Sequence, residues 1–463
     1  MTAQPTYFLA IDNGSQSTKV SIVDDHGEVH GFAQHPLRPY DTREGRVVHP
    51  GDDVWESIQA ATRSALARFT PGARAIAAVG LCTIRFCRAL MDENGFLTEP
   101  LLSWMDPRVG RPFDPSASAA RYVATSSGYV AHRLTGRFVD AAGNYQGMWP
   151  IDQDTWRWSD HDEDYRRTGM PRERLLELVD PGELLGEVTR DAASVTGLRA
   201  GTPVFATSND KAVEALGSGL NRPGRLLLSL GTYITSMAVG TRRQRGEGES
   251  WRNFGAISGQ YLHESGGIRR GMWTVSWFRD LVGARDDDEL NAEAAAVPIG
   301  SGGLYTILDW LAPDDAPHRR GAMIGFDGSQ GRAAIYRSIL EGIAFTMAAR
   351  RAELERELDT PFAELVVSGG GSRSALMAEI LADAYNLPVL RPAVPDAAGI
   401  GAAISAAVGC GRFDDWAGAV AAMVRFGSPI EPNASRAASS RIHAERYALI
   451  RQRTDAMLAE TGS

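Results

Sequence analysis

Apolar residues in the first part of this chain fall into short blocks that are separated by turn residues. Residues 7–11 form a continuous apolar run, and after a polar turn residues 20–23 form another. Short apolar runs bounded by such turns are typical of buried strands. We therefore expect two strands joined by a turn, with a third strand near residues 29–34 after the turn residues 24–27.

The spacing of apolar positions changes to a helical period over residues 52–69. Asp52 and Asp53 stand at its start, where carboxylates cap free backbone N–H groups. Later, residues 203–207 read as a strand that breaks before Asp210 and leads into a short helix. Strands that alternate with helices in this way indicate an α/β fold.

A second strand–turn–strand unit has the plan of the first. Residues 225–230 form a largely apolar strand, Gly231 and Thr232 make the turn, and residues 234–239 continue as a strand. Two such units about 220 residues apart suggest two related domains, although a chance match of two hairpins is the alternative. We place the domains at residues 1–220 and 221–463, since turn residues cluster at this junction.

The chain of 463 residues is long enough for two or three domains. Its net charge is -9 and its basic residues are scattered, so neither nucleic acid nor an anionic membrane surface is expected as a partner. The three cysteines form no CxxC pair, which argues against a disulfide framework or a zinc site. No basic and apolar leader or long apolar run is found, and we expect a cytoplasmic protein.

Each glycine–hydroxyl turn can aim backbone N–H groups at a phosphate, although an ordinary hairpin turn gives the same pattern. A stronger signal is the strand at residues 365–368, which is followed by Gly369, Gly370, Gly371 and a helical pattern over residues 372–385. Three glycines before a helix let a phosphate or a flat base approach the backbone. A tight strand-to-helix turn is the alternative, and it rarely needs three glycines.

Two acids follow strands in the positions where α/β sheets bind ligands. Asp12 is either such a ligand or an Asx-turn residue, and Asp210 is either a functional acid or a helix cap. Lys19 is either a γ-phosphate donor or a solvated strand charge. Two acids, two glycine–hydroxyl turns and a triple-glycine loop together predict a nucleotide–magnesium site, since magnesium prefers carboxylates and phosphate oxygens.

With these motifs the chain resembles the FGGY family of carbohydrate kinases. LAIDNGSQSTKVSIVDDHGEV is similar to the family's first phosphate hairpin, and SNDKAVEALGSGLNRPGRLLLSLGT is similar to the stretch with the catalytic acid and the second hairpin. VVSGGGSRSALMAEILADAYNLPV resembles the adenosine loop, and DAAGIGAAISAA resembles the closing helix. The resemblance implies two ribonuclease H-like (actin-like ATPase) domains that flank a nucleotide and sugar cleft, and a homodimer.

Roles carried over from the family follow residue by residue. Asp210 matches the general base, and Asp12 with Asp210 matches the acids that hold Mg2+. Binding of ATP is implied for Asp12, Gly14, Ser15, Lys19, Gly231, Thr232, Gly370, Gly371 and Ser374. In-line phosphoryl transfer by such a site rests on positioning and charge neutralisation.

The sugar segment matches less well. Arg85 stands at the arginine of glycerol kinases, but Phe86 replaces the acid that follows it, and the histidine of xylulose kinases is absent. LLSWMDPRV matches the next element and brings in Trp104, as a face for sugar C–H groups or as a core residue, and Asp106. Asn144 and the base Asp210 complete the expected substrate contacts.

The chain also departs from the family's usual pattern at Tyr233, after the second turn, and at Asp396 and Gly399 in the closing helix. We therefore expect an ATP- and magnesium-dependent kinase that phosphorylates a hydroxyl of a ketose, a sugar alcohol or a related small sugar. One alternative is a xylulose- or glycerol-type kinase. The other is a non-catalytic, actin-like ATP-binding regulatory protein, against which Asp210 and the sugar segment count.

Overall fold

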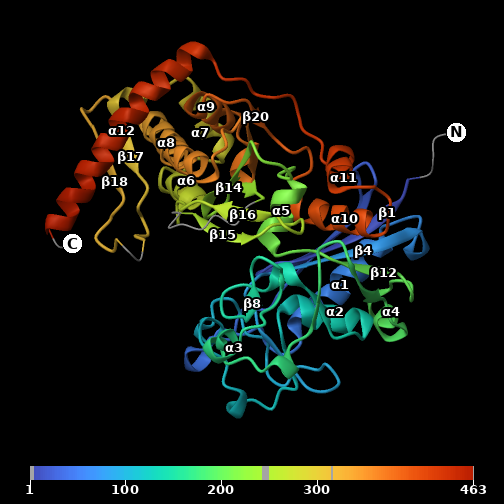
Figure 1. Cartoon of the computed structure of the whole chain (residues 1–463). Coiled ribbons are helices and arrows are strands. Elements are labelled where there is room, and N and C mark those ends of the chain that lie inside the picture. The colour runs from blue at the N-terminus through green and yellow to red at the C-terminus, as the bar shows by residue number, and fades with distance from the viewer. Residues whose placement is uncertain (1–4, 242–249, 314–315, 462–463) are drawn as a thin grey trace.

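A computed structural model describes residues 5–241, 250–313 and 316–461. The chain forms two six-stranded mixed sheets, each in its own lobe (Figure 1). The strands of the first sheet are, in spatial order, β11 (Leu184–Glu187), β12 (Pro203–Ala206), β4 (Ile76–Thr83), β1 (Tyr7–Asn13), β2 (Ser17–Asp24) and β3 (Val29–Pro36). Those of the second are β20 (Val389–Leu390), β19 (Glu364–Ser368), β13 (Arg225–Leu230), β14 (Ile234–Gly240), β16 (Tyr261–Glu264) and β15 (Trp251–Phe254).

The two sheets repeat one plan. In the first, β1 pairs parallel to β4 and antiparallel to β2, and in the second, β13 pairs parallel to β19 and antiparallel to β14. The hairpins β1–β2 and β13–β14 are the two strand–turn–strand units of the sequence. Five strands of each sheet correspond, in the order β12, β4, β1, β2, β3 and the order β20, β19, β13, β14, β16, while the sixth strands, β11 and β15, lie at opposite edges. The expected α/β class is confirmed.

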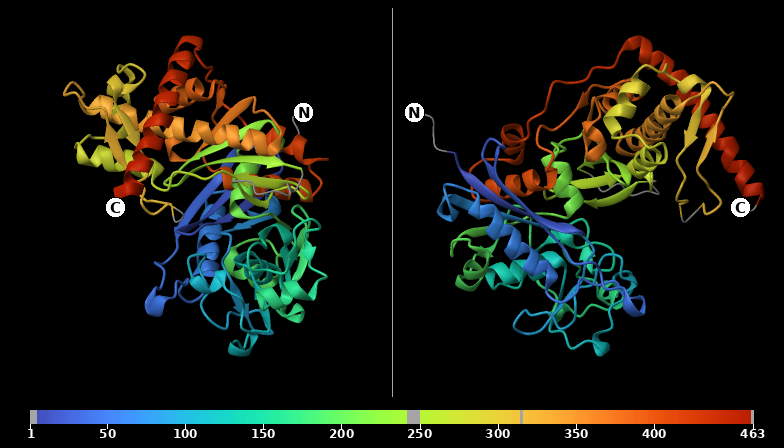
Figure 2. Two further views of the ribbon diagram at one scale, coloured as in Figure 1. Left: turned by 60° about the vertical axis from the view of Figure 1, so that its left-hand side comes forward. Right: turned by 180° about the vertical axis from the view of Figure 1, so that it is seen from behind.

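Helices cover the outer faces of both sheets and fill the space between them (Figures 1 and 2). The first lobe carries α1 (Asp53–Ala67), α2 (Ser126–Thr135), α3 (Asp162–Thr168), α4 (Arg190–Thr196) and α5 (Asp210–Gly217). The second carries α6 (Gly271–Leu281), α7 (Asp287–Ala295), α8 (Arg332–Leu358), α9 (Ala375–Tyr385) and α12 (Ala434–Thr461). Two-stranded sheets are β5 (Ala89–Met91) with β6 (Tyr122–Ala124), β7 (Val139–Ala141) with β10 (Glu177–Val179), β8 (Ile151–Asp152) with β9 (Arg157–Trp158), and β17 (Tyr305–Ile307) with β18 (Ala322–Ile324).

Late in the sequence the chain returns to the first lobe. Helices α10 (Ala397–Gly409) and α11 (Trp416–Met423) lie beside β1 and β4 (Figure 1). One buried apolar cluster joins Phe8 and Ala10 of the first sheet, Leu227 of the second, and Ala402 and Ile404 of α10. The junction between the lobes is therefore a continuous hydrophobic core. The domain limits at residues 220 and 221 stay a prediction.

Two local expectations need correction. Asp52 occupies the N-cap position of α1, but its carboxylate accepts hydrogen bonds from Tyr129 and Arg133 and caps no backbone N–H. Asp53 accepts bonds from Arg38 instead. In a bond from arginine both partners are charged, whereas the backbone N–H that a cap would accept from is neutral, so the long-range partners win.

The other correction concerns the helix expected from residue 372. It begins at Ala375, because Gly370–Arg373 form a separate 3₁₀ turn. Among the described residues, no helix combines the length and the apolar character that crossing a membrane requires.

Candidate active site

The turn between β1 and β2 is a tight hairpin in which the Gly14 N–H donates to the carbonyl of Ser17 (3.1 Å). Gly14 and Ser15 are half-buried, and the Tyr40 hydroxyl donates to the carbonyl of Ser15 at 3.1 Å, which fixes the turn. On the adjacent strands Asp12 and Lys19 are paired in register and form an ion pair of 3.4 Å. The hairpin thus presents one acid and one base beside a fixed turn.

Asp12 is buried in an acidic environment. The pKa of Asp12 is raised to about 6, chiefly by burial and also by Asp396 and Asp210, while Lys19 opposes the rise. Burial disfavours the charged form of Lys19, yet Asp12 and Asp396 outweigh this and raise its pKa. Three carboxylates near one ammonium leave a surplus of negative charge. A divalent cation fits this set of donors, because hard cations prefer carboxylate oxygens.

Asp210 is the first residue of α5. The Asn209 side chain caps this helix by accepting from the N–H of Ala212 (3.1 Å). One alternative for Asp210 was a role as the helix cap, but the neighbouring residue Asn209 fills that role. The side chain of Asp210 is 27% exposed, and its Oδ1 lies 3.6 Å from Nε of Arg85. Burial raises the pKa of Asp210, against the pull of Arg85 and Lys211. A partly exposed carboxylate with a raised pKa suits the acceptance of a proton.

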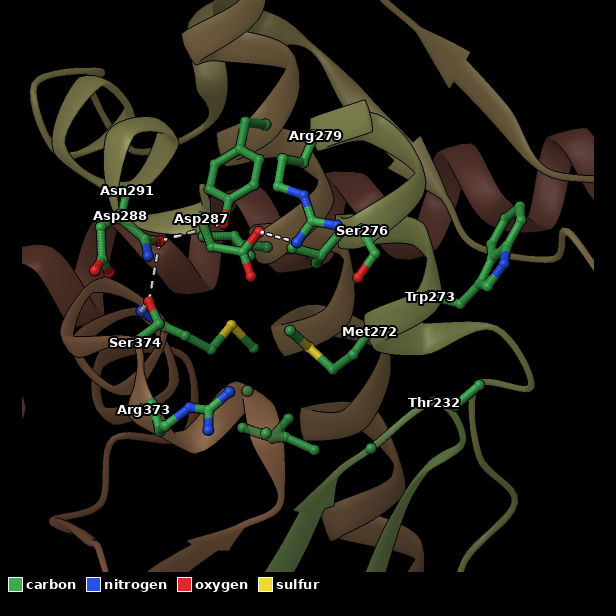
Figure 3. Close-up of a pocket in the computed structure, with 18 residues that line it drawn as sticks. Thr232, Met272, Trp273, Ser276, Arg279, Asp287, Asp288, Asn291, Arg373 and Ser374 are labelled. Carbon is green, nitrogen blue, oxygen red and sulfur yellow. Dashed lines mark hydrogen bonds and ion pairs between the residues drawn. The ribbon is translucent and has the colours of Figure 1, made fainter. Parts of the chain in front are cut away.

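The second turn borders a large cavity of about 800 Å³ (Figure 3). Gly231 and Thr232 accept hydrogen bonds from the first N–H groups of α6 at Met272 and Gly271. Opposite this turn, α7 contributes Asp287 and Asn291, and Arg279 of α6 pairs with Asp287 at 3.2 Å. A cavity of this size is in the range of small-molecule and cofactor sites.

The triple-glycine loop forms another wall of the same cavity. Gly369 has φ +80°, and a Cβ there would lie 2.8 Å from the carbonyl oxygen of Leu230, so only glycine fits. Gly370, Gly371 and Ser374 line the cavity, as expected for an adenosine loop. The Ser374 hydroxyl caps α9 and donates to Oδ1 of Asn291 at 3.0 Å (Figure 3). Because Oδ1 of Asn291 already accepts this bond, the amide nitrogen is the atom of that side chain that can still donate a hydrogen bond.

Arg85 follows β4 and reaches the second lobe. Its guanidinium contacts Glu264 of β16 through NH1 at 2.7 Å and NH2 at 3.3 Å. Phe86 has φ +65°, a conformation that costs a non-glycine residue about 1–3 kcal/mol and occurs most often at functional sites. The loop that carries Arg85 is therefore held in an unusual shape by its surroundings.

The remaining expected sugar contacts lie nearby but differ in access. Trp104 is 47% exposed and lines a cavity of about 190 Å³ together with Phe86 and Trp149. Asp106 is buried, and Arg108 and the N–H of Val47 occupy its carboxylate, which lowers its pKa despite burial. Asn144 is also buried and donates to Asp140 at 3.4 Å. Trp104 is thus open to a ligand, whereas Asp106 shapes the loop.

The sequence does not predict three acids as residues of the site. Glu264 ends a four-residue strand, and no local pattern marks it. Glu214 is one turn beyond Asp210 and accepts from Ser229 and Ser368 of the second sheet. Asp396 was noted as a departure in the closing helix, and its carboxylate accepts from Ser21 at 2.5 Å. Of these three acids, only Asp396 lies in a recognisable motif, that of the closing helix.

Two sheets with five corresponding strands, a phosphate-type hairpin turn in each and an acid cluster near their junction define a ribonuclease H-like, actin-like ATPase fold. Residues 7–114 match the N-terminal domain of the FGGY family of carbohydrate kinases, and residues 226–410 match the C-terminal domain. The chain belongs to the FGGY family of carbohydrate kinases. It is therefore a kinase, and the hypothesis of a non-catalytic regulator is set aside.

Known relatives agree with this membership. The chain is 42% identical over 445 residues to the uncharacterized sugar kinase YgcE of Escherichia coli (strain K12), across 93% of this chain and 90% of that protein. An autoinducer-2 kinase of Enterobacter sp. (strain 638) is 26% identical, across 98% and 94%. The structure of a xylulose kinase from Rhodospirillum rubrum superposes with a TM-score of 0.85 at 21% identity, across 97% and 99%. The last comparison concerns the fold alone.

Proposed function

We propose that this kinase transfers the γ-phosphoryl group of ATP to a hydroxyl of a small sugar or polyol, a ketose or a sugar alcohol, with Asp210 as the general base. The observation that carries the proposal is the placement of Asp210 at the start of α5, partly exposed and beside Arg85. Its carboxylate takes the proton of the attacking hydroxyl while the oxygen bonds to phosphorus and ADP leaves. The raised pKa of Asp210 makes it a stronger base than an exposed aspartate.

Nucleotide binding is proposed for the cavity of about 800 Å³. The base and ribose lie against Gly370, Gly371 and Ser374, and the phosphates reach the turns at Gly14–Ser15 and Gly231–Thr232. Lys19 faces the γ-phosphate. Backbone N–H groups in such turns bind phosphate oxygens without a side-chain clash.

Mg2+ is proposed to bind at Asp12, with Asp210 nearby. The fit rests on the surplus of carboxylates around Lys19 and on the raised pKa of Asp12, which a cation would lower again. When bound, the ion neutralises charge on the phosphates. Removal of the metal with a chelator should abolish turnover, and added Mg2+ should restore it.

The sugar is proposed to contact Arg85 through hydrogen bonds and Trp104 through its ring face. Asp106 and Asn144 support these contacts from behind. Relatives named glycerol kinase are 26–28% identical, and Arg85 matches their arginine, so a glycerol- or xylulose-type substrate is the second candidate. Phe86 counts against it, because an apolar ring replaces a hydrogen-bonding acid.

The test is sugar-stimulated release of ADP across a panel of ketoses and sugar alcohols that includes glycerol and xylulose. With the best substrate, Asp210→Asn should lower kcat by about 10²- to 10⁴-fold. Asp162→Asn is the matched control, since Asp162 is likewise the first residue of a helix, α3, and should leave kcat unchanged. Intact turnover in Asp210→Asn would refute the assignment of the base, and no stimulation by any sugar would refute the substrate class.

A further inference from the structure

One face of the β15–β16 hairpin surrounds the guanidinium of Arg85. Trp251 and Glu264 are direct cross-strand partners, and Asn253 lies two residues beyond Trp251 on the same face. Glu264 accepts from NH1 and NH2 of Arg85, and the Trp251 ring centroid lies 4.6 Å from Cζ of Arg85. We call Trp251, Asn253 and Glu264 the arginine cradle.

Each member of the cradle limits how Arg85 can turn. The two-pronged contact with Glu264 fixes the plane of the guanidinium, and the Trp251 ring covers one face of it. Asn253 donates to Oε1 of Glu264, the same oxygen that receives NH1, and so fixes the carboxylate in turn. Arg85 and Glu264 are largely buried, with side chains 16% and 6% exposed. This is a fixed contact between the lobes.

The orientation set by Glu264 decides which edge of Arg85 faces Asp210. With NH1 and NH2 on Glu264, the Nε edge is directed to Oδ1 of Asp210 at 3.6 Å. An arginine without Glu264 could turn its two-pronged edge onto Asp210 and cover the carboxylate. Glu264 therefore competes with Asp210 for the same cation.

We propose that Glu264 is a positioning residue that holds Arg85 in the orientation for sugar binding and keeps the carboxylate of Asp210 open. The inference rests on the proposed function of Arg85 and Asp210. It assigns to the second lobe a part in the sugar site, although no segment recognised as sugar-binding in the sequence comes from that lobe. The cradle thereby couples sugar binding to the contact between the lobes.

The first experiment compares Glu264→Gln with Glu341→Gln. Glu341 is equally buried, in α8, and pairs with Arg337 at 2.8 Å, so its variant reproduces the loss of a buried ion pair elsewhere. Glu264→Gln should lower kcat/KM for the sugar by about 10- to 100-fold and leave the KM for ATP unchanged, because a bond to a charged group is lost. Glu341→Gln should leave both unchanged. Equal kinetics in the two variants would overturn the proposal.

A double-mutant cycle tests whether Glu264 acts through Arg85. In an Arg85→Gln background, Glu264→Gln should cause no further loss of kcat/KM for the sugar. A full additional loss would contradict the positioning role. Glu264→Asp should recover part of the activity, since it keeps the charge.

Should Glu264→Gln fail to fold, Trp251→Leu provides a second route. Trp251 is 48% exposed, so its replacement is tolerated better, and the variant should lower kcat/KM for the sugar without a change in the KM for ATP. Unchanged sugar kinetics in Trp251→Leu would then overturn the cradle. A wild-type enzyme without any sugar-stimulated turnover would refute the proposed function, whereas an active wild type with an unaffected Glu264→Gln would refute this inference alone.

Discussion

Two buried aspartates of the first lobe show how neighbours decide what a carboxylate can do. Burial, together with the nearby acids Asp396 and Asp210, raises the pKa of Asp12 to about 6. Asp106 is equally buried, yet hydrogen bonds from Arg108 lower its pKa. The carboxylate of Asp106 is already paired with Arg108, whereas Asp12 shares Lys19 with other nearby acids. This difference, which no sequence pattern reveals, makes Asp12 the better candidate for a metal.

His49 gives a prediction at the same scale. It is buried beside Tyr40, neither ring nitrogen has a hydrogen-bond partner among the residues that the structure describes, and burial lowers its pKa to about 4. The unfolded chain binds the proton near pH 6.5, so the folded state loses stability as the pH falls from 6.5 to 4. The loss attributable to His49 is on the order of 3 kcal/mol.

Urea unfolding at pH 7.5 and pH 5 measures the part of this loss that falls between these pH values, about 2 kcal/mol. The free energy of unfolding should fall less steeply with pH in His49→Gln than in the wild type. His26→Gln, at an exposed position, is the control and should keep the wild-type slope. An identical pH slope in His49→Gln would show that the histidine does not titrate as expected.

Single elements near each hairpin turn could be predicted from the sequence, because their signals are local. The apolar runs of β1 and β2 and the turn at Gly14 lie within a few residues of one another, and the structure has them where expected. Glu264 could not be found in this way. Its partner Arg85 is 179 residues away, and a glutamate at the end of a short strand looks like a solvated charge.

The contact between helices α5 and α10 depends on glycine residues at the point where they cross. A Cβ on Gly401 of α10 would lie 2.1 Å from the carbonyl oxygen of Val213 on α5, and one on Gly217 of α5 would lie 1.8 Å from that of Ala397. In the structure these glycines let two helix backbones touch, and α5 carries Asp210 at its start.

Gly401→Ala should therefore push α10 away from α5. We expect a loss of about 1–3 kcal/mol in unfolding free energy, as for overpacked cores, together with a lower kcat because α5 moves. Urea unfolding and steady-state kinetics measure the two effects. Gly427→Ala is the control, since a Cβ there meets no atom within 4 Å, and its stability should stay the same or rise slightly. Wild-type stability in Gly401→Ala would contradict the close crossing.

For the whole molecule, the repeated hairpin in the sequence correctly indicated two similar halves, since five strands have the same order in both sheets. What the sequence pattern could not show is the return of α10 and α11 to the first sheet. A helix that is mostly alanine and glycine can pack against either lobe, and its place is fixed by close backbone fits such as that of Gly80 on β4 against Ala402. The sequence boundary at residue 220 therefore divides the chain at a point where the core is continuous.

This continuity predicts the behaviour of the separated halves. A fragment of residues 1–220 lacks α10, so Phe8, Ala10 and Ala78 lose the apolar surface that covers them in the intact chain. We expect this fragment to be unfolded or aggregated in circular dichroism and size-exclusion experiments. Joining residues 397–423 to it through a flexible linker should restore a folded first lobe, and the intact chain should unfold in one transition. A cooperative unfolding transition in the fragment 1–220 alone would contradict the shared core and support two independently stable domains.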